Sequence, residues 1–462
     1  MLGHTPSRVQ LLKGPPGTGK TVTTAASVLT RCAARFRPGN VVLLSAHTHL
    51  AVDTLIRRLL QYLSPFRQEA VRQGLQFAQI ILARVHSSEV PADTDAIRNF
   101  PARPCATQVN RWMREGILII GGTTATILKM AEELSLRQPF VNAGEHFNVD
   151  LLVVDEASMM VFPHFLALAT LVKPSGAMML AGDNRQLSPI VAHDWENEDR
   201  PPAQHYQPFK SAYDSILRII EESAVASDAA VQSPLTFTFR LPPIIRDLIS
   251  RVYRNLDDIE LEGFDDEVTA HSDLTMAGEW SDVWRGDNGL ILIVHSERSS
   301  RQSNQLEAAI IETVLAACPD PVDDSVAIIT PHRAQKALLR SSLQAYAETV
   351  TIIDTVERLQ GGERPTIIVS GTESDPHAIG AAASFILNLN RANVAFSRTQ
   401  QRLIVVCAET LLDHVPTELE DYESALLWKS LRNLCRRSIL ATTVATYRVR
   451  ALAPLLRDDQ AA

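Results

Sequence analysis

The chain has 462 residues, of which 45% are hydrophobic, and its formal net charge is −9. This length allows about two to four domains with substantial cores. The negative charge excludes a polycationic surface, so any nucleic acid would have to bind in a local basic groove. The five cysteines are scattered and nowhere spaced as CxxC, which argues against a disulfide framework or a zinc module.

Membrane and export signals are missing from the sequence. No apolar run approaches the ~18 residues that a spanning helix needs. The N-terminus has no apolar signal-peptide core. We therefore expect a cytoplasmic protein that has no membrane partner.

A glycine-rich loop near the N-terminus follows an apolar run at residues 9–12 and fits the pattern GxxxxGK[ST]. Its residues are Gly14, Pro15, Pro16, Gly17, Thr18, Gly19, Lys20 and Thr21. Glycines let backbone N–H groups turn around phosphates, and the helix expected from about Thr21 points its positive end at them. Lys20 is expected to reach the β/γ-phosphates, and the Thr21 hydroxyl to bind Mg²⁺. The pattern predicts nucleotide binding; the alternative is an ordinary Gly/Pro turn.

Short apolar runs alternate with helical patterns along the whole chain. They lie at residues 41–44, 80–83, 117–120, 151–154 and 177–180, and again at 290–294, 326–329, 350–353, 366–369 and 403–406. Such runs are typical of strands buried on both faces of a parallel sheet with helical crossovers. Two α/β domains in tandem are the simplest interpretation.

Two adjacent carboxylates, Asp155 and Glu156, follow the apolar run at 151–154. Asp155 at the strand tip would hold Mg²⁺ opposite Thr21. Glu156 faces the other way, where it can orient and deprotonate an attacking water. An apolar strand has no structural need of these acids, although a surface turn is the alternative. The pair predicts hydrolysis of the bound nucleotide.

Further segments occur in a defined order on both halves of the chain. They are SAHTHLAVD at 45–53, GDNRQLSP at 182–189, FRL at 239–241, TPHRAQ at 330–335, LQGGE at 359–363 and NVAFSR at 393–398. With the glycine-rich loop and the carboxylate pair, they resemble the motifs of superfamily 1 helicases, in the branch of the nonsense-mediated-decay helicase. The resemblance covers nearly the whole chain.

The fold implied by this resemblance is two tandem RecA-like P-loop NTPase domains, each a parallel sheet flanked by helices. The first would span residues 1–212 and the second residues 213–425. Residues 426–462 would form a C-terminal helical tail, because Trp428, Leu431 and Leu434 have helical spacing.

The resemblance also implies that MgATP binds between the two domains and assigns roles around it. Gln186 would sense the γ-phosphate. Arg240 and Arg398 would act as arginine fingers on the departing phosphoryl group; a solvated salt bridge is the alternative for each. Glu363 would contact the ribose hydroxyl, on a loop supported by Gln360 and Gly361.

Contacts with a single-stranded nucleic acid are implied as well. The family's positions correspond here to Thr48, His49, Thr123, Thr124, Thr330, His332, Arg333 and Thr355. Hydroxyls, backbone N–H groups and an arginine suit phosphate and sugar contact without sequence readout. Capping of strand ends is the alternative for the threonines.

Three departures separate this chain from the family pattern. Only thirteen residues precede Gly14, and none is a convincing counterpart of the family's adenine-recognising glutamine. The interval 56–115 leaves little room for accessory domains. His49, Phe396 and Ser397 replace the usual residues of their motifs.

The expected function is an ATP-dependent helicase or translocase that moves along single-stranded DNA or RNA in the 5′ to 3′ direction. A protein partner or a fused domain could complete it. The alternative is an ATPase switch or scaffold, stimulated by nucleic acid or regulated by a partner, that unwinds nothing. A small-molecule kinase is a weaker alternative, because it would leave Gln186, Arg240 and Arg398 without roles.

Overall fold

The computed structural model describes residues 8–74, 78–94, 96–136, 147–189, 210–222, 230–265, 279–285, 289–319, 322–359, 362–416 and 419–455. The chain divides into two compact units. The first comprises Met1–Gly14, Gly19–Asn184 and Ser188–Leu235, and the second Pro15–Thr18, Arg185–Leu187 and Thr236–Ala462. The main division thus follows Leu235 and not residue 212, because helix α6 and strand β8 complete the first unit.

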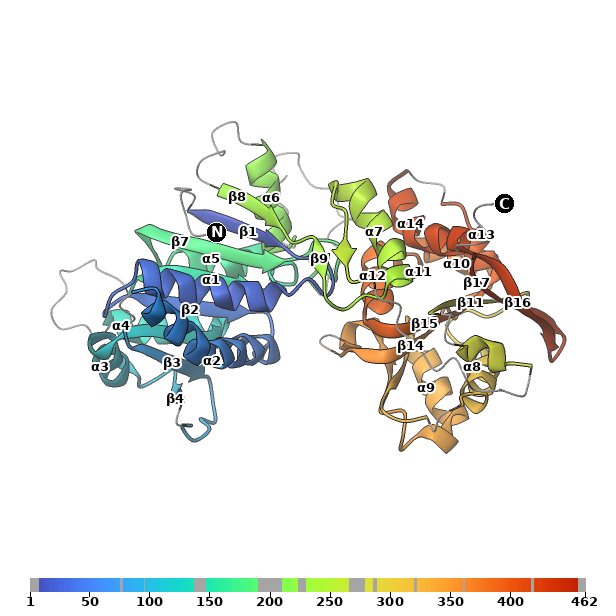
Figure 1. Ribbon diagram of the computed structural model, residues 1–462, viewed down its shortest axis with the longest axis horizontal. Coiled ribbons are helices and arrows are strands. Elements are labelled where there is room, and N and C mark those ends of the chain that lie inside the picture. The colour runs from blue at the N-terminus through green and yellow to red at the C-terminus, as the bar shows by residue number, and fades with distance from the viewer. Residues whose placement is uncertain are drawn as a thin grey trace. The chain divides into compact units, whose positions relative to one another are not determined.

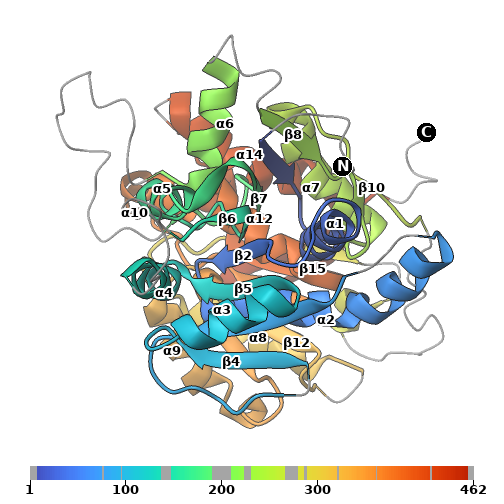
Figure 2. The ribbon, with the colours of Figure 1, turned by 90° about the vertical axis from the view of Figure 1, so that its left-hand side faces the viewer.

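A parallel sheet of eight strands forms the centre of the first unit, in the order β4-β3-β5-β2-β6-β7-β1-β8. The strands are β1 (Val9–Lys13), β2 (Val41–Ala46), β3 (Ile80–His86), β4 (Ile97–Pro101), β5 (Ile117–Thr123), β6 (Val149–Asp155), β7 (Val172–Gly182) and β8 (Ala230–Pro234). All six apolar runs expected in this half are strands. Figure 2 shows the sheet from β4 at its lower edge to β8 at its upper edge.

Helices cover both faces of this sheet, as a doubly buried parallel sheet requires. They are α1 (Lys20–Ala34), α2 (His49–Arg72), α3 (Ala106–Glu115), α4 (Thr124–Leu136), α5 (Phe162–Ala169) and α6 (Ala212–Glu222). One core packs α1 and α2 through residues such as Val28 and Leu55. The other packs α3 to α6 through residues such as Ile127 and Phe165. Successive residues of one strand, for example Leu11 and Leu12, enter different cores.

The second unit has a sheet of seven strands in the order β13-β12-β14-β15-β11-β17-β16. These are β11 (Leu290–His295), β12 (Val326–Thr330), β13 (Ile352–Thr355), β14 (Arg364–Ser370), β15 (Thr399–Ala408), β16 (Cys435–Val444) and β17 (Tyr447–Pro454). The first five in sheet order are parallel, and β17 and β16 pair antiparallel. A separate parallel pair joins β9 (Phe237–Thr238) to β10 (Glu262–Gly263). The expectation of tandem RecA-like α/β domains is confirmed.

Two groups of helices flank the second sheet (Figure 1). α8 (Gln305–Ala316) and α9 (Arg333–Ser342) pack on one face, where Ile310 and Leu339 join the core of the sheet. On the other side lie α7 (Pro243–Asp257), α12 (Leu389–Ser397), α13 (Glu409–Asp413) and α14 (Leu419–Leu434). The shorter elements are η2 (Ser281–Trp284), η3 (Gln344–Tyr346), η4 (Val356–Leu359), α10 (Pro376–Ala381) and α11 (Ala383–Ile386).

The C-terminal segment corrects the expected helical tail. Trp428 and Leu431 do lie buried on α14, and the Trp428 ring packs edge-on against Phe396. After Leu434, however, the chain forms the hairpin β16–β17, which extends the sheet beside β11. β17 alternates buried residues such as Val449 and Ala451 with exposed arginines, which is a strand pattern and not a helical one. Among the helices that the structure describes, none is long and apolar enough to cross a membrane.

Candidate functional site

The glycine-rich loop connects β1, which ends at Lys13, to α1, which begins at Lys20. Gly17 and Gly19 have φ values of 74° and 77°, in the left-handed region that glycine adopts without a Cβ penalty. The Thr18 hydroxyl donates to the Pro15 carbonyl at 2.8 Å and closes the turn. This backbone can direct successive N–H groups at an anion in front of a helix N-terminus.

Lys20, Thr21 and Asp155 meet on the first unit. The Lys20 ammonium donates to the Gly14 carbonyl, and Thr21 Oγ1 donates to Asp155 Oδ2 at 3.2 Å. Burial raises the pKa of Asp155, although the Glu156 N–H, the Lys20 charge and the Thr21 hydroxyl oppose this effect. A buried carboxylate held beside a hydroxyl is costly for folding alone.

Thr21 and Asp155 are the candidate protein ligands of a divalent cation. No group of three or more His, Cys, Asp or Glu side chains able to hold a metal occurs among the residues that the structure describes. Mg²⁺ does not need such a cage, because it keeps several waters and takes one or two protein ligands beside phosphate oxygens. Thr21 and Asp155 therefore fit a magnesium ion that arrives with a nucleotide.

Glu156 follows β6 in a strained backbone conformation. Its φ of 51° is rare for a residue other than glycine, and its N–H donates to Asp155 Oδ1 at 3.0 Å. Such strain, which costs about 1–3 kcal/mol, is concentrated at functional sites. The role of Glu156 in orienting the attacking water stays a prediction.

The segment that contains Gln186 leaves the sheet beside the glycine-rich loop. β7 ends at Gly182, whose carbonyl accepts from the Gly14 N–H at 3.1 Å. Asp183, next along the chain, is buried, whereas Gln186 is partly exposed. The sheet therefore brings the start of this segment to the phosphate loop.

Three predicted residues from separate motifs meet on the second unit. The Arg240 guanidinium forms an ion pair with Glu363 and donates to the Ser397 carbonyl at 3.2 Å. Burial lowers the pKa of Arg240 to about 10; the Glu363 carboxylate opposes this effect, and the neighbouring Arg398 charge adds to it. Arg240 is therefore still a cation at neutral pH. Glu363, expected to contact ribose, is bound to Arg240 here, and Gln360 and Gly361 lie outside the described residues.

The predicted nucleic-acid residues of the first unit lie at neighbouring strand ends. β2 and β5 pair, with Ala46 beside Thr123. Thr48 caps α2 by accepting from the Ala51 N–H at 3.2 Å, and Thr123 shares a 2.9 Å hydrogen bond with the Thr126 hydroxyl. Thr124, the first residue of α4, is buried. Thr48 and Thr123 thus make local hydrogen bonds, and contact of these threonines with nucleic acid stays a prediction.

His49 is exposed at the start of α2, where its Nδ1 lies 3.0 Å from Arg84 Nη2. The neighbouring Leu50 is 61% exposed, which is unusual for a large apolar side chain. This end of α2 is therefore open to a ligand.

The corresponding residues of the second unit are more deeply placed than expected. Thr330 and Thr355 are paired neighbours at the ends of β12 and β13, and both are buried. His332 Nε2 lies 2.9 Å from Glu373 Oε1, and both side chains are largely buried. Arg333, by contrast, is exposed at the start of α9. Of these four side chains, Arg333 is the one that the structure presents to solvent.

Sequence reasoning missed Glu373 and Phe385 beside these positions. The Phe385 ring lies tilted against the His332 ring, with the ring centres 5.4 Å apart. The Arg391 guanidinium, a cationic candidate from the sequence, lies 3.7 Å from the Phe385 ring centre and pairs with Glu357. Neither Glu373 nor Phe385 has a periodicity that could have revealed it. Phe239, the first residue of the FRL segment, is 66% exposed.

Comparison with known proteins addresses both units. Two family models, each described as an AAA domain, match residues 2–192 and 274–410. The DNA replication ATP-dependent helicase/nuclease JHS1 of Arabidopsis thaliana is 23% identical over 417 residues, covering 88% of this chain and 27% of the relative. The probable RNA helicase armi of Drosophila melanogaster is 24% identical, with 86% and 34% covered.

The matches span both units, as do the motifs. The two family models and the helicase relatives together support membership of this chain in superfamily 1 of the helicases. They also support the branch of the DNA2-like and nonsense-mediated-decay helicases, which the motifs predicted. Use of a nucleotide and a divalent metal follows from this membership.

Two further matches are to another curated helicase and to a solved helicase structure. The DNA polymerase alpha-associated DNA helicase A of Schizosaccharomyces pombe is 24% identical, covering 86% of this chain and 60% of the relative. The solved complex of the Arterivirus nonstructural protein 10 (helicase) with DNA is 16% identical, with a TM-score of 0.41 and coverage of 92% and 64%. This superfamily 1 chain thus spans about a quarter to three fifths of the length of the curated relatives named above.

Proposed function

We propose that this chain is a nucleic-acid motor that couples hydrolysis of MgATP to movement along single-stranded DNA or RNA. The observation that carries the proposal is that two arginines from separate motifs lie near each other on the second unit. The Arg240 guanidinium donates to the carbonyl of Ser397, the residue before Arg398, at 3.2 Å. Phosphate chemistry on the first unit alone would not require them. A superfamily 1 motor needs such cations to act on the nucleotide held by the first unit.

The residues of the first unit would bind and activate the nucleotide. Mg²⁺ held by Thr21 and Asp155 would neutralise charge on the phosphates. Lys20 would exchange its contact with the Gly14 carbonyl for the phosphates. Glu156 would orient the attacking water and accept its proton.

The arginines would act on charge that develops in the transition state. An arginine finger contributes about 10³ to 10⁵ in rate. Arg240 keeps its positive charge at neutral pH, since its lowered pKa is still about 10. Gln186 would report the γ-phosphate, because an amide can donate to phosphate and accept from a neighbour.

Nucleic acid would lie along the strand ends of both units. On the first unit, the exposed end of α2 at His49 supports this placement, and on the second the exposed Arg333 does. Cationic and backbone contacts of this kind bind phosphate without reading sequence. The relatives' names include both DNA and RNA helicases, so either strand is a candidate track. Travel in the 5′ to 3′ direction is proposed from the family branch.

A second candidate is an ATPase switch without unwinding activity. The Arg240–Glu363 ion pair favours it, because an arginine held by a carboxylate has to be released before it can act on phosphate. In that case a nucleic acid or protein partner would control the release. The two candidates make the same prediction for nucleotide binding and differ in strand movement.

A strand-displacement assay separates the motor from the switch. Duplexes of DNA and of RNA would carry a single-stranded overhang at either the 5′ or the 3′ end. The motor predicts ATP-dependent displacement from the 5′ overhang, which Lys20→Ala abolishes. The switch would be favoured by a different set of results. Single strands would accelerate ATP hydrolysis, but neither overhang would support displacement of the duplex strand, and a block bound at the strand end would not be removed.

A further inference from the structure

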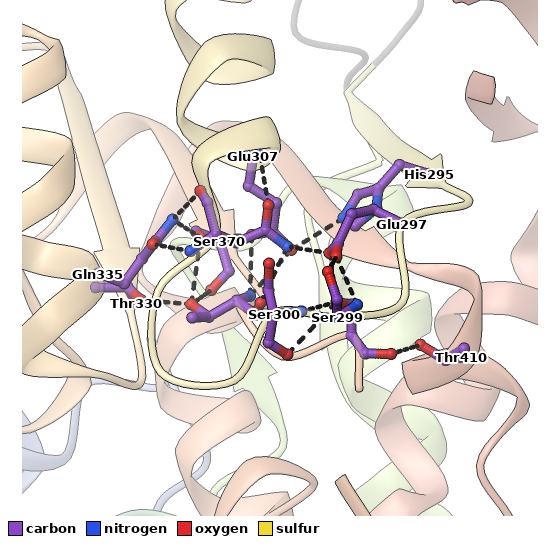
Figure 3. Close-up of polar contacts among 12 residues, drawn as sticks. His295, Glu297, Ser299, Ser300, Glu307, Thr330, Gln335, Ser370 and Thr410 are labelled. Atoms are coloured by element: carbon purple, nitrogen blue, oxygen red, sulfur yellow. Dashed lines mark hydrogen bonds and ion pairs between the residues drawn. The ribbon is translucent and has the colours of Figure 1, made fainter. Parts of the chain in front are cut away.

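A buried polar network joins five segments of the second unit where its parallel strands end. Figure 3 shows side chains converging from β11, β12, α8, α9 and the end of β14. Its fully buried members include His295, Asn304, Glu307, Thr330, Gln335, Ser370, Thr372 and Ser374. Polar groups buried this deeply are costly unless they are satisfied, so the network must be specific in its geometry.

Glu307 is the acceptor at the centre of this network. The Thr372 N–H donates to both carboxylate oxygens, at 3.0 and 2.9 Å, and the Ser370 hydroxyl donates at 2.5 Å. His295 Nε2 lies 3.2 Å from the same carboxylate. Glu307 therefore binds the segment that follows β14 and not its own helix.

The start of α8 shows why this carboxylate is available. Asn304 caps the helix by accepting from the Glu307 N–H at 3.0 Å. In a capping box the acid at Glu307's position would accept from the cap residue's own N–H. Here the Asn304 N–H donates instead to Gln335 Oε1 on α9 at 2.7 Å. Gln335 thus accepts the Asn304 N–H in place of Glu307, and the Glu307 carboxylate is available to accept from the end of β14 and the residues after it.

The segment held by Glu307 is strained. Thr372 has φ of 70°, a left-handed conformation that β-branched residues rarely adopt. Its hydroxyl meets the Thr330 hydroxyl at 2.9 Å. The next residue, Glu373, faces His332 at 2.9 Å. The strained turn therefore touches the segment 330–333 at two points.

From this geometry we propose that Glu307 is a positioning residue for the nucleic-acid-contacting segment Thr330–Arg333. The inference rests on the proposed function and names a part of it. Glu307 holds Thr372 in its left-handed turn. Thr372 and Glu373 then fix Thr330 and His332, so that Arg333 leaves the sheet edge in one orientation. Glu307 itself is fully buried and touches no ligand.

The test compares Glu307→Gln with Val314→Ala in the full chain. A glutamine keeps the shape of Glu307 but offers one acceptor oxygen to two donors. Val314 is a fully buried core residue of the same helix, away from the network, and its truncation provides a destabilised control. Ser370→Ala removes one donor to Glu307 and serves as a milder variant if Glu307→Gln does not fold.

Two readouts are measured on each variant. The first is the rate of ATP hydrolysis as a function of oligo(dT) or oligo(U) concentration. It gives the half-saturating oligonucleotide concentration and the maximal rate separately. The second is amide hydrogen exchange of residues 330–333 and 371–374. For Glu307→Gln we expect the oligonucleotide concentration that gives half-maximal stimulation to rise about tenfold. A tenfold loss of affinity is what the loss of one charge-assisted hydrogen bond would cause. The maximal rate should change less than about twofold, and exchange should increase in the two segments.

The two readouts separate this inference from the proposed function. Equal exchange in the two segments for Glu307→Gln and for Val314→Ala, at matched melting temperatures, would overturn the positioning role. An equal change of the half-saturating oligonucleotide concentration in both variants would also overturn the positioning role. If neither nucleic acid stimulates the wild-type chain, the proposed function fails, while increased exchange confined to the two segments would still support Glu307 as their positioning residue.

Discussion

The Arg240–Glu363 ion pair predicts what removal of one charge does to the second unit. Side-chain exposure is 17% for Arg240 and 32% for Glu363, so neither charge is fully solvated. Burial lowers the pKa of Arg240 to about 10 even with Glu363 present. At ~1.36 kcal/mol per pKa unit, the guanidinium is already penalised by about 3 kcal/mol. Glu363→Gln removes its main compensating charge.

We expect Glu363→Gln to destabilise the second unit by about 2 kcal/mol. Breaking a fully buried pair costs about 3–5 kcal/mol, and partial exposure of Glu363 reduces that loss. For a unit of this size, the change corresponds to a fall of roughly 4–8 °C in Tm. Differential scanning calorimetry of the full chain would measure it, with the exposed Glu348→Gln as the control.

The nucleotide dependence of the same variant tests the predicted ribose contact. If Glu363 exchanges Arg240 for the ribose hydroxyls, Glu363→Gln should raise KM for ATP and reduce the preference for ATP over dATP. A Tm equal to that of wild type, together with an unchanged ATP-to-dATP ratio, would refute the reasoning on both counts.

The remaining predictions concern hydrolysis and the metal site. Glu156→Gln should bind MgATP normally but lower kcat by at least about 10²-fold, since an amide cannot accept the proton; near-normal turnover would reject Glu156 as the base. Arg398→Ala should lower kcat by about 10³-fold with unchanged nucleotide affinity, whereas equal loss of both would indicate a folding role. The raised pKa of Asp155 means that the affinity for MgATP should fall as pH is lowered through that pKa, and titration calorimetry would detect it. For the metal-free chain the sign reverses, because the folded state holds the Asp155 proton more tightly and loses stability as pH rises. Asp155→Asn should therefore raise Tm at pH 7 without metal while weakening Mg²⁺-dependent binding, and a lower Tm would contradict this.

The strands and the phosphate loop could be predicted because their signals are local. Doubly buried parallel strands need continuous apolar runs, and the loop at Gly17 and Gly19 needs residues that tolerate positive φ. The carboxylates at the tip of β6 were predictable for the same reason.

The C-terminal hairpin and the first-unit boundary were not predictable from the same signals. α14 supplies a helical pattern up to Leu434, and the strands that follow are half exposed, so no continuous apolar run marks them. β8 has no fully buried residue and is weak in sequence for the same reason. Tertiary pairing with β1 and β11 decides both elements.

The partners of the site residues depend on tertiary contacts between distant segments. Thr330 is fully buried against Thr372, 42 residues away, and Arg240 is bound to Glu363, 123 residues away. Motif positions identify such residues without showing which groups satisfy them. Glu307 was missed because its pattern is that of an ordinary first-turn helix acid.

The most direct test of the account is the kcat for ATP with and without a single strand, using oligo(dT) and oligo(U) of equal length. The proposed motor predicts that kcat rises at least about tenfold with one of the two strands and does not rise in Lys20→Ala. Binding the strand equally well in the ground state and the transition state would leave kcat unchanged. An unchanged kcat at saturating concentrations of both strands would contradict the coupling of hydrolysis to nucleic acid.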